Sequence, residues 1–196
     1  MEKKDQCKMC RRAGEKLFLK GEKCNLPSCP FARRSYGPGQ HGGKAKGFRK
    51  SSDYAIQLNE KQKAKAIYGV SENQLSTYCD KARRVKGATG QILMDMLESR
   101  LDNIVYRAAW AQSRRQARQF ISHRSVSVNN KISKSSNMQI SKGDKIEIKS
   151  AVSDVKRDIP DWLKVSSNKL EVIGRPSYDG DQSIINEQLI IEYYSR

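Results

Sequence analysis

The stretch that most constrains this chain runs over residues 98–149, where the spacing of apolar residues changes from helical to alternating. Around its start, apolar residues recur at three- and four-residue intervals: Leu97, Leu101, Ile104, Val105 and Ala108. That spacing predicts a helix with one buried face. Further on, Val126 and Val128 alternate with serines, Asn129-Asn130 suits a tight turn, and residues 145–149 alternate charge with isoleucine. The stretch therefore predicts helices followed by half-buried strands.

A second helix is predicted to begin at Ser113. Gln116 follows at the spacing at which a serine hydroxyl and a glutamine side chain satisfy exposed backbone N–H groups at a helix start. Three apolar residues then share one face: Ala117, Phe120 and Ile121. Arg115 and Arg118, with Arg114 at the boundary, project from another side. The helix is thus expected to bury one stripe and to present a row of guanidiniums.

The charge of this region requires an anionic partner. Residues 111–150 contain nine Lys or Arg against two acidic residues, and the whole chain has a formal net charge of +17. A basic surface can serve solubility alone, but clustering on one helix edge favours binding, and phosphate is the obvious ligand. A membrane is a weaker candidate because no apolar run approaches the roughly 18 residues that span a bilayer.

The first residues contain no apolar stretch of the kind that secretory signals carry. We therefore expect a cytoplasmic protein, whose five cysteines are reduced or bound to metal. Cys7 and Cys10 form one close pair, and Cys24 and Cys29 form another, a spacing that favours one structural zinc ion. Two disulfides, four free thiols or an iron–sulfur cluster are the alternatives. Cys79 stands apart on a predicted apolar helix face and is expected in the core.

Residues 32–52 are rich in glycine and basic side chains, which is typical of a flexible linker or of a loop that becomes ordered on phosphate. A helix is predicted over residues 53–68, between Ser52 and Gly69, and another from Ser71 to near residue 87. The histidines, residues 41 and 123, have no nucleophile or carboxylate at a catalytic spacing.

Beyond residue 150, short apolar runs bounded by Pro, Gly and Asn predict further strands of the same sheet. Trp162 lies among them and is expected in the core or as a stacking platform. Residues 185–196 fit a helix or a strand equally well by pattern.

Several motifs resemble the S4 family of small-subunit ribosomal proteins and its RNA-binding domain. They are Arg100-Leu101-Asp102-Asn103, residues 113–119, His123, Val128-Asn129 and Gly143-Asp144. The Pro-Gly-Gln-His-Gly block at residues 38–42, the segment 52–69 and the four-cysteine spacing are also similar to zinc-bearing members. The chain departs from the family at residues 2–6 and at Asn130, where the family usually has glycine; asparagine tolerates the same left-handed backbone.

The resemblance implies site residues. The zinc ligands would be Cys7, Cys10, Cys24 and Cys29. Contacts to ribosomal RNA would come from two helices, the turn after them and the strand turn: Arg100, Asn103, Arg107, Ser113, Arg114, Arg115, Gln116, Arg118, His123, Arg124, Asn129 and Lys131. Contacts to messenger RNA at the entry channel would come from Lys44, Lys46, Arg49 and Lys50. The family closes with a helix that returns to the helical domain.

We therefore expect an α+β protein. A zinc-stapled segment with its glycine-rich loop spans residues 1–43, and a helical domain spans residues 44–90 and is completed by a C-terminal helix at 182–196. Inserted between them, at residues 91–181, an S4-type RNA-binding domain packs two helices on a small, mainly antiparallel sheet.

The function that the resemblance implies is structural and not enzymatic. The protein would bind small-subunit ribosomal RNA early in assembly, line the messenger entry region and affect translational accuracy together with the fifth small-subunit protein. Its place would be a ribosome of the cytoplasm or of an organelle, with no small-molecule substrate. Two alternatives carry the same small domain or the same chemistry: an RNA-modifying enzyme, which needs a larger catalytic domain, and a zinc-bearing nucleic-acid-binding regulator.

Overall fold

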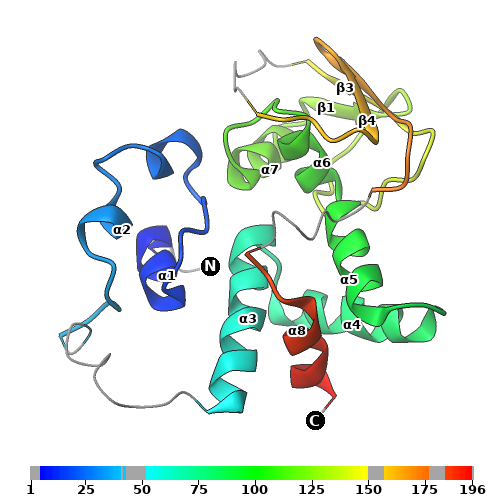
Figure 1. Ribbon diagram of the computed structural model, residues 1–196. Helices are drawn as coiled ribbons and strands as arrows, with labels where there is room; N and C mark the ends of the chain where they lie inside the picture. Colours follow the sequence, from blue (N-terminus) through cyan, green and yellow to red (C-terminus); the bar gives the residue numbers. More distant parts are fainter. Residues whose placement is uncertain (1–4, 41, 43–51, 150–156, 177–183, 196) are drawn as a thin grey trace. The chain divides into compact units, whose positions relative to one another are not determined.

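The computed structural model describes residues 5–40, 42, 52–149, 157–176 and 184–195 (Figure 1). Contacts divide the chain into two compact units. We call residues 1–76 with 184–196 the first unit, and residues 77–183 the central unit. The division falls inside a helix, α4 (Glu72–Arg84), whereas the sequence predicted a boundary at residue 90; that finer boundary stays a prediction. No helix in the described ranges is long and apolar enough to span a membrane.

The first unit begins with α1 (Gln6–Ala13), a 3-10 helix (Gly21–Cys24) and α2 (Pro30–Arg33). The long helix α3 (Asp53–Tyr68) follows, with Ser52 as its N-cap and Gly69 in the left-handed region after its last residue. Both ends match the sequence prediction. The reciprocal cap at the start of α4 is confirmed as well, because Gln74 N donates to Ser71 Oγ and Ser71 N donates to Gln74 Oε1.

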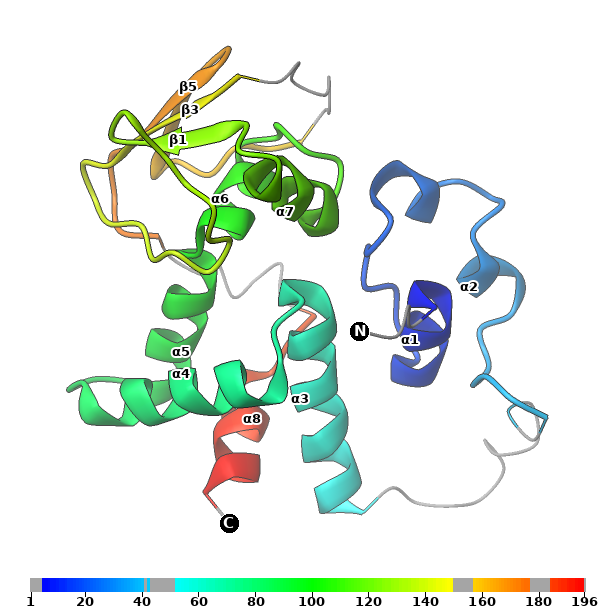
Figure 2. The same ribbon diagram turned by 180° about the vertical axis from the view of Figure 1, so that it is seen from behind.

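The C-terminal segment is a helix, α8 (Glu187–Tyr194), which lies beside α3 in both views of the ribbon (Figures 1 and 2). Asn186 begins it by accepting the N–H groups of residues 188 and 189. Gln57 Nε2 on α3 donates to Glu192 on α8 at 3.0 Å. The pattern of residues 185–196 left helix and strand open, and the structure confirms the helix that the family resemblance implied.

The central unit contains α5 (Thr89–Glu98), α6 (Leu101–Arg107) and α7 (Arg114–Ser122), followed by five strands. The strands are β1 (Val126–Val128), β2 (Lys131–Ile132), β3 (Lys145–Ile148), β4 (Leu163–Ser166) and β5 (Lys169–Val172). They form one antiparallel sheet in the order β2-β1-β3-β5-β4. One continuous apolar cluster joins α6, α7 and the sheet. This is the predicted arrangement of two helices on a small sheet.

The helical pattern from Leu97 to Ala108 is interrupted in the structure. Its five apolar residues are all buried, but Ser99 and Arg100 separate α5 from α6. Arg100 is extended, and the free backbone groups pair with a distant segment: Leu101 N donates to Met138 O, and Ile140 N donates to Ser99 O, each at 2.9 Å. A pairing across this distance in sequence has no signature in local periodicity.

In the sheet, Asn129 and Asn130 both have positive φ, as the predicted turn requires. The predicted alternation of β1 is wrong at Ser127, which is buried like the valines beside it. β1 is a three-residue interior strand that pairs with both β2 and β3, so its middle residue has no free edge. Trp162 and Cys79 are buried, as expected of core residues.

Candidate nucleic-acid interface

Two buried carboxylates organise the predicted arginine face. Glu98 ends α5 and Asp102 lies in the first turn of α6, and their side chains are 0% and 2% exposed. Charges at such depth are stable only when they are paired and hydrogen-bonded. Each of these two carboxylates is paired with arginines from the set that the family resemblance assigned to RNA.

Asp102 holds two arginines. Arg100 donates to both of its oxygens, at 3.0 and 2.9 Å, and Arg118 of α7 donates to Oδ2 from Nε and Nη2, at 2.9 and 2.6 Å. Arg100 also donates to the hydroxyl of Tyr78 at 3.0 Å. Burial alone would lower the pKa of Arg100, but the Asp102 carboxylate outweighs burial and raises it. Asp102 therefore fixes α7 to the start of α6.

Glu98 binds the side chains on the other side of the arginine face. It accepts Asn103 Nδ2 at 2.7 Å and two N–H groups of Arg107 at 2.9 Å. Asn103 Oδ1 in turn accepts Arg114 Nε at 2.7 Å, and Arg114 Nη2 lies 4.0 Å from Glu98. The arginine side chains are thus oriented from beneath, at low conformational-entropy cost when they bind a ligand.

The predicted RNA-contacting residues differ in how deeply they are buried. Arg100 and Asn103 are only 2% and 1% exposed, so they lie beneath the surface and not on it. Arg107, Arg114 and Arg118 are partly exposed, with one edge bound to the buried carboxylates or to Asn103. The exposed members of the set lie on α7, at the turn after it and on the strand turn: Arg115, His123, Arg124, Asn129 and Lys131.

Ser113 and Gln116 start α7 as the sequence predicted. Gln116 N donates to Ser113 Oγ at 3.3 Å, but the side chain of Gln116 accepts the N–H of Gln112 and not that of Ser113. Both side chains therefore cap the helix. Asn129 likewise supports the strand turn, because it donates to Asp144 at 2.8 Å and accepts Lys145 N at 3.0 Å.

Sequence reasoning missed Arg157 and Tyr106. The guanidinium of Arg157 lies 3.7 Å from the centroid of the Tyr106 ring, and that of Arg114 lies 4.3 Å from it. Arg157 also donates to the carbonyls of Tyr106, Ala111 and Gln112. Burial lowers the pKa of Arg157, and the charges of Arg114 and Arg107 lower it further against the opposing effect of Tyr106. No local pattern marked Arg157, since its ring partner is 51 residues away.

The four cysteines of the predicted zinc site lie in the first unit. Cys10, Cys24 and Cys29 are buried and Cys7 is partly buried. Burial raises the pKa of Cys10; a backbone hydrogen bond from Leu17 opposes this, and the charges of the other three thiols raise the pKa further. Lys20 N donates to Cys24 Sγ at 3.4 Å. Within the described ranges, no three His, Cys, Asp or Glu side chains are arranged as a metal site. The donor set suits zinc chemically, and zinc binding stays a prediction.

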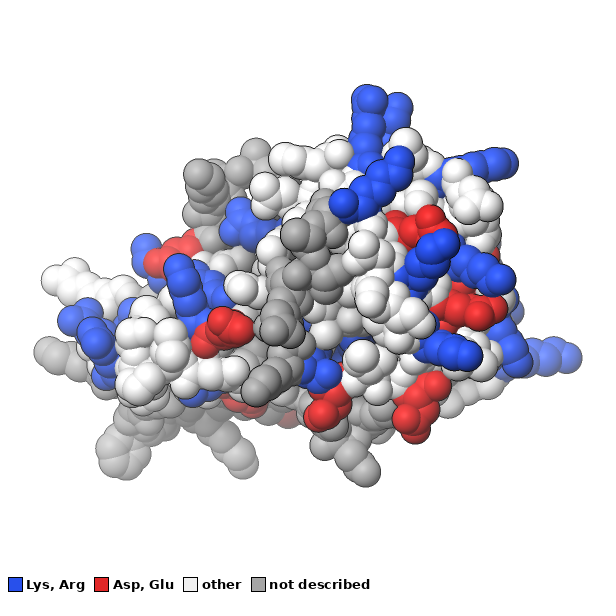
Figure 3. Space-filling view, turned by 90° about the horizontal axis from the view of Figure 1, so that it is seen from above, with Lys and Arg blue, Asp and Glu red and all other residues white. Residues whose placement is uncertain are grey.

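The predicted messenger-binding residues Lys44, Lys46, Arg49 and Lys50 lie outside the described residues, as does His41. Figure 3 shows Lys and Arg side chains standing out from one face of the molecule, with Asp and Glu between them.

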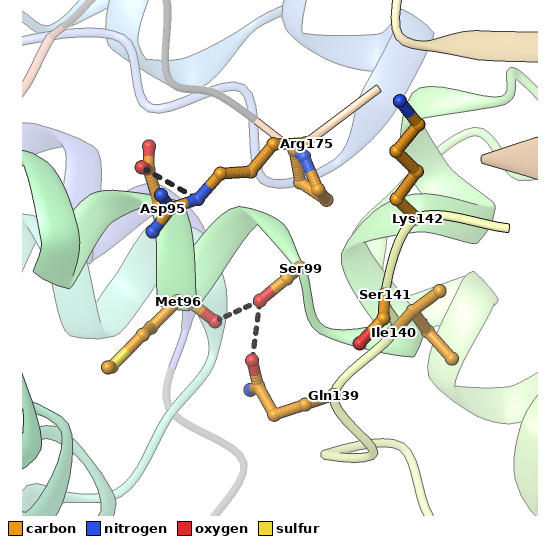
Figure 4. A pocket seen from close by; sticks show the side chains of 9 residues that line it. Asp95, Met96, Ser99, Gln139, Ile140, Ser141, Lys142 and Arg175 are labelled. Carbon is orange, nitrogen blue, oxygen red and sulfur yellow. Dashed lines mark hydrogen bonds and ion pairs between the residues drawn. The ribbon is translucent and has the colours of Figure 1, made fainter. Parts of the chain in front are cut away.

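A shallow pocket of about 400 Å³ lies in the central unit (Figure 4). Asp95, Ser99 and Gln139 line it, with Lys142 and Arg175 at its rim. Ser99 Oγ donates to Gln139 Oε1 at 2.5 Å, and Arg175 lies 3.8 Å from Asp95. The first contact ties the α5–α6 break to the segment before β3, and the second ties α5 to the segment after β5.

Two helices on a small antiparallel sheet, with arginines fixed on one edge and exposed cations beside them, define a nucleic-acid-binding protein. The family models agree: the ribosomal protein S4/S9 N-terminal domain matches residues 2–98, and the S4 domain matches residues 99–146. Proteins named small ribosomal subunit protein uS4 are similar along almost the whole chain. Those of Thermoanaerobacter sp. (strain X514) and Nitrosomonas eutropha are 42% and 44% identical, over 97% of this chain and 96% and 97% of their own. That of Clostridium beijerinckii is 43% identical over 97% of this chain and 96% of its own. The chain belongs to the ribosomal protein S4 family.

Proposed function

We propose that this protein is a structural component of the small ribosomal subunit and binds its ribosomal RNA directly. The observation that carries the proposal is the arginine face of α6 and α7, oriented from beneath by Glu98 and Asp102. Full-length similarity to proteins named small ribosomal subunit protein uS4 supports the same role. Relatives that align over 97% of the chain favour a structural protein over an RNA-modifying enzyme.

The protein recognises the RNA by its phosphate backbone and its helical shape. A-form helices expose phosphates and 2′-hydroxyls better than base edges, and planar guanidiniums bind phosphates with two parallel hydrogen bonds. The exposed cations, Arg115, Arg124 and Lys131, reach the backbone first, and the anchored Arg114 and Arg118 offer a fixed second row. Arg100 and Asn103 support this row from below and make no direct contact.

A salt series tests the proposal. Changing Arg115→Ala together with Arg118→Ala should weaken binding of the full chain to small-subunit ribosomal RNA. It should also flatten the dependence of log K on log salt by about one to two phosphate contacts. Arg84→Ala, which removes an exposed arginine at the end of α4 in the same unit, is the matched control. An unchanged slope in the double variant would remove these arginines from the interface.

Competition with duplex DNA separates the ribosomal role from that of a DNA-binding regulator. Folded ribosomal RNA should compete far better than duplex DNA at the same salt concentration. Equal affinity for the two would favour the regulator.

The protein acts early in subunit assembly, lies beside the fifth small-subunit protein and affects translational accuracy through that neighbour. Lys44, Lys46, Arg49 and Lys50 contact messenger RNA at the entry channel. The family resemblance supports these roles, and a run of four cations within seven residues suits a phosphate chain. Crosslinking of messenger RNA to purified subunits that carry these four residues as glutamine tests the messenger contact; unchanged crosslinking yield would refute it.

One zinc ion, held by Cys7, Cys10, Cys24 and Cys29, stabilises the N-terminal segment. Four thiolates fill a tetrahedral site and leave no open position, so the metal is structural and serves no catalysis. Burial of three of the four thiols, in a segment with few other buried residues, supports the proposal. Elemental analysis of the purified chain should find about one zinc per molecule; a metal-free chain that is fully folded would refute it.

A further inference from the structure

Arg107, Arg114 and Arg157 gather around Tyr106; we call these four residues the tyrosine–arginine cluster. The guanidiniums of Arg157 and Arg114 lie 3.7 and 4.3 Å from the ring centroid. Arg107 continues the cluster at the end of α6, where it is bound to Glu98. Arg157 comes from the segment before β4, far from the others in sequence.

The placement of Arg157 is electrostatically costly in the free protein. Among the described residues, burial acts most strongly against the charge of its guanidinium, Arg114 and Arg107 repel it, and the Tyr106 side chain favours its charged form. Its other partners are three backbone carbonyls, of Tyr106, Ala111 and Gln112. Carbonyl dipoles offset part of the repulsion and supply no negative charge. An anion at this position would relieve like-charge repulsion that the fold itself maintains.

The geometry suits an anion with several acceptor oxygens. A guanidinium stacked on an aromatic ring keeps its N–H groups at its edges, where they can donate. Among the described residues, the three carbonyls engage three of the five N–H donors of Arg157. Arg114 begins α7, so the cluster is continuous with the exposed arginine face.

We propose that the tyrosine–arginine cluster binds one phosphate group of the RNA backbone, with Arg157 as a contact residue. The inference rests on the proposed function and extends its interface beyond residues 99–146, which match the S4 domain. An RNA phosphate is favoured over an acidic protein segment because the cluster adjoins the arginine row of α7 and the chain carries +17 charges.

Arg157→Gln in the full chain tests the assignment, with in vitro transcribed small-subunit ribosomal RNA as the probe. Glutamine retains one amide donor for the carbonyls and removes the charge. At moderate salt, the affinity should fall by about tenfold, the scale of a charge-assisted hydrogen bond, and the salt slope should decrease by about one. Arg84→Gln in the same unit should change the slope less.

A second variant separates phosphate binding from loop support. Arg157→Lys retains the charge and loses the planar fork, so the salt slope should stay that of the unsubstituted protein while the affinity falls by a few fold. Loss of affinity in both variants without any change of slope, together with a lowered melting temperature, would show that Arg157 only fastens its loop. If Arg157→Gln does not fold, an affinity of Arg157→Lys identical to that of the unsubstituted protein would overturn the proposal.

The same RNA-binding measurements distinguish failure of the cluster proposal from failure of the proposed function. If ribosomal RNA binds with a steep salt slope that Arg115→Ala reduces, the interface stands, and an unchanged slope in Arg157→Gln refutes only the cluster. Failure of the unsubstituted chain to bind this RNA would refute the proposed function itself. Binding of poly-glutamate that depends on Arg157, with RNA affinity unchanged, would reassign the cluster to an acidic protein segment.

Discussion

The central unit and the N-terminal segment of the first unit are held together by different means. The central unit buries a continuous cluster of apolar residues from α6, α7 and four of the five strands, including two tryptophans. Between residues 5 and 40, the buried residues are three cysteines and Leu17. Small segments with so little apolar burial need a crosslink or a metal to fold. We therefore expect the RNA-binding fold to be stable by itself and the N-terminal segment to depend on its cysteines.

Removing a core tryptophan should have the largest effect. Trp110 is 1% exposed, so Trp110→Ala should cost the central unit about 3–5 kcal/mol, through lost transfer energy and a cavity. Urea unfolding followed by the fluorescence of Trp162, in the same unit, measures this loss. Trp110→Phe should cost less, since most of the volume is retained. An unfolding midpoint equal to that of the unsubstituted protein would show that the cluster does not hold this unit together.

Removal of the proposed zinc ion should have an intermediate and local effect. Cys24→Ser, or a chelator, should increase amide hydrogen exchange over residues 5–40 and leave the tryptophan-monitored transition of the central unit unchanged. Cys79→Ala is the matched control, because Cys79 is a buried cysteine outside the set and its loss should leave residues 5–40 protected. Unfolding of the whole chain on chelation would contradict the separation of the two regions.

The smallest effect is expected in acid, within the helical part of the first unit. Glu72 accepts Lys61, Lys65 and Tyr194 at 2.9, 2.7 and 2.8 Å. Burial raises the pKa of Glu72, but these hydrogen bonds outweigh it and lower the pKa to about 2. Ionised Glu72 therefore stabilises the fold above the ordinary carboxyl pKa of 4.5, and this contribution is lost as the pH falls toward 2.

Glu72→Gln tests this contribution. The variant should be less stable than the unsubstituted protein near neutral pH, and the difference should shrink between about pH 4.5 and pH 2. The difference should be at most about 1 kcal/mol, because the Glu72 side chain is 42% exposed and water screens the pairs. Helical circular dichroism during thermal unfolding measures it. Glu171→Gln, which removes a carboxylate at an exposed position on β5, is the control for the loss of one negative charge.

Local sequence signals were sufficient to predict the features that depend on residues only a few positions apart. The caps at Ser52, Ser71 and Ser113 set helix starts because each side chain accepts a backbone N–H three residues on. The strand turn at residues 129–130 followed from the tolerance of asparagine for positive φ.

The features that the sequence analysis did not predict depend largely on contacts between residues distant in sequence. The break between α5 and α6 requires residues 138–140, and the burial of Arg100 depends on Tyr78, 22 residues upstream, as well as on the neighbouring Asp102. An arginine motif predicts a basic helix edge but not which members turn inward to a carboxylate. Arg157 was missed because its carbonyl partners lie more than forty residues upstream. Messenger contacts and zinc occupancy stay predictions.

Because α3 pairs with α8, the two units of the chain can complete their folding at different times during synthesis. Residues 77–183 are made between the two helices, so the central unit can fold while α3 still lacks its partner. Domains generally fold as units during translation, with the N-terminal parts emerging first. The surface of α3 that α8 covers stays open until residues 187–194 have been made. A chain that stops before residue 187 would thus carry a folded RNA-binding unit together with an uncovered face of α3, which quality-control proteases can recognise.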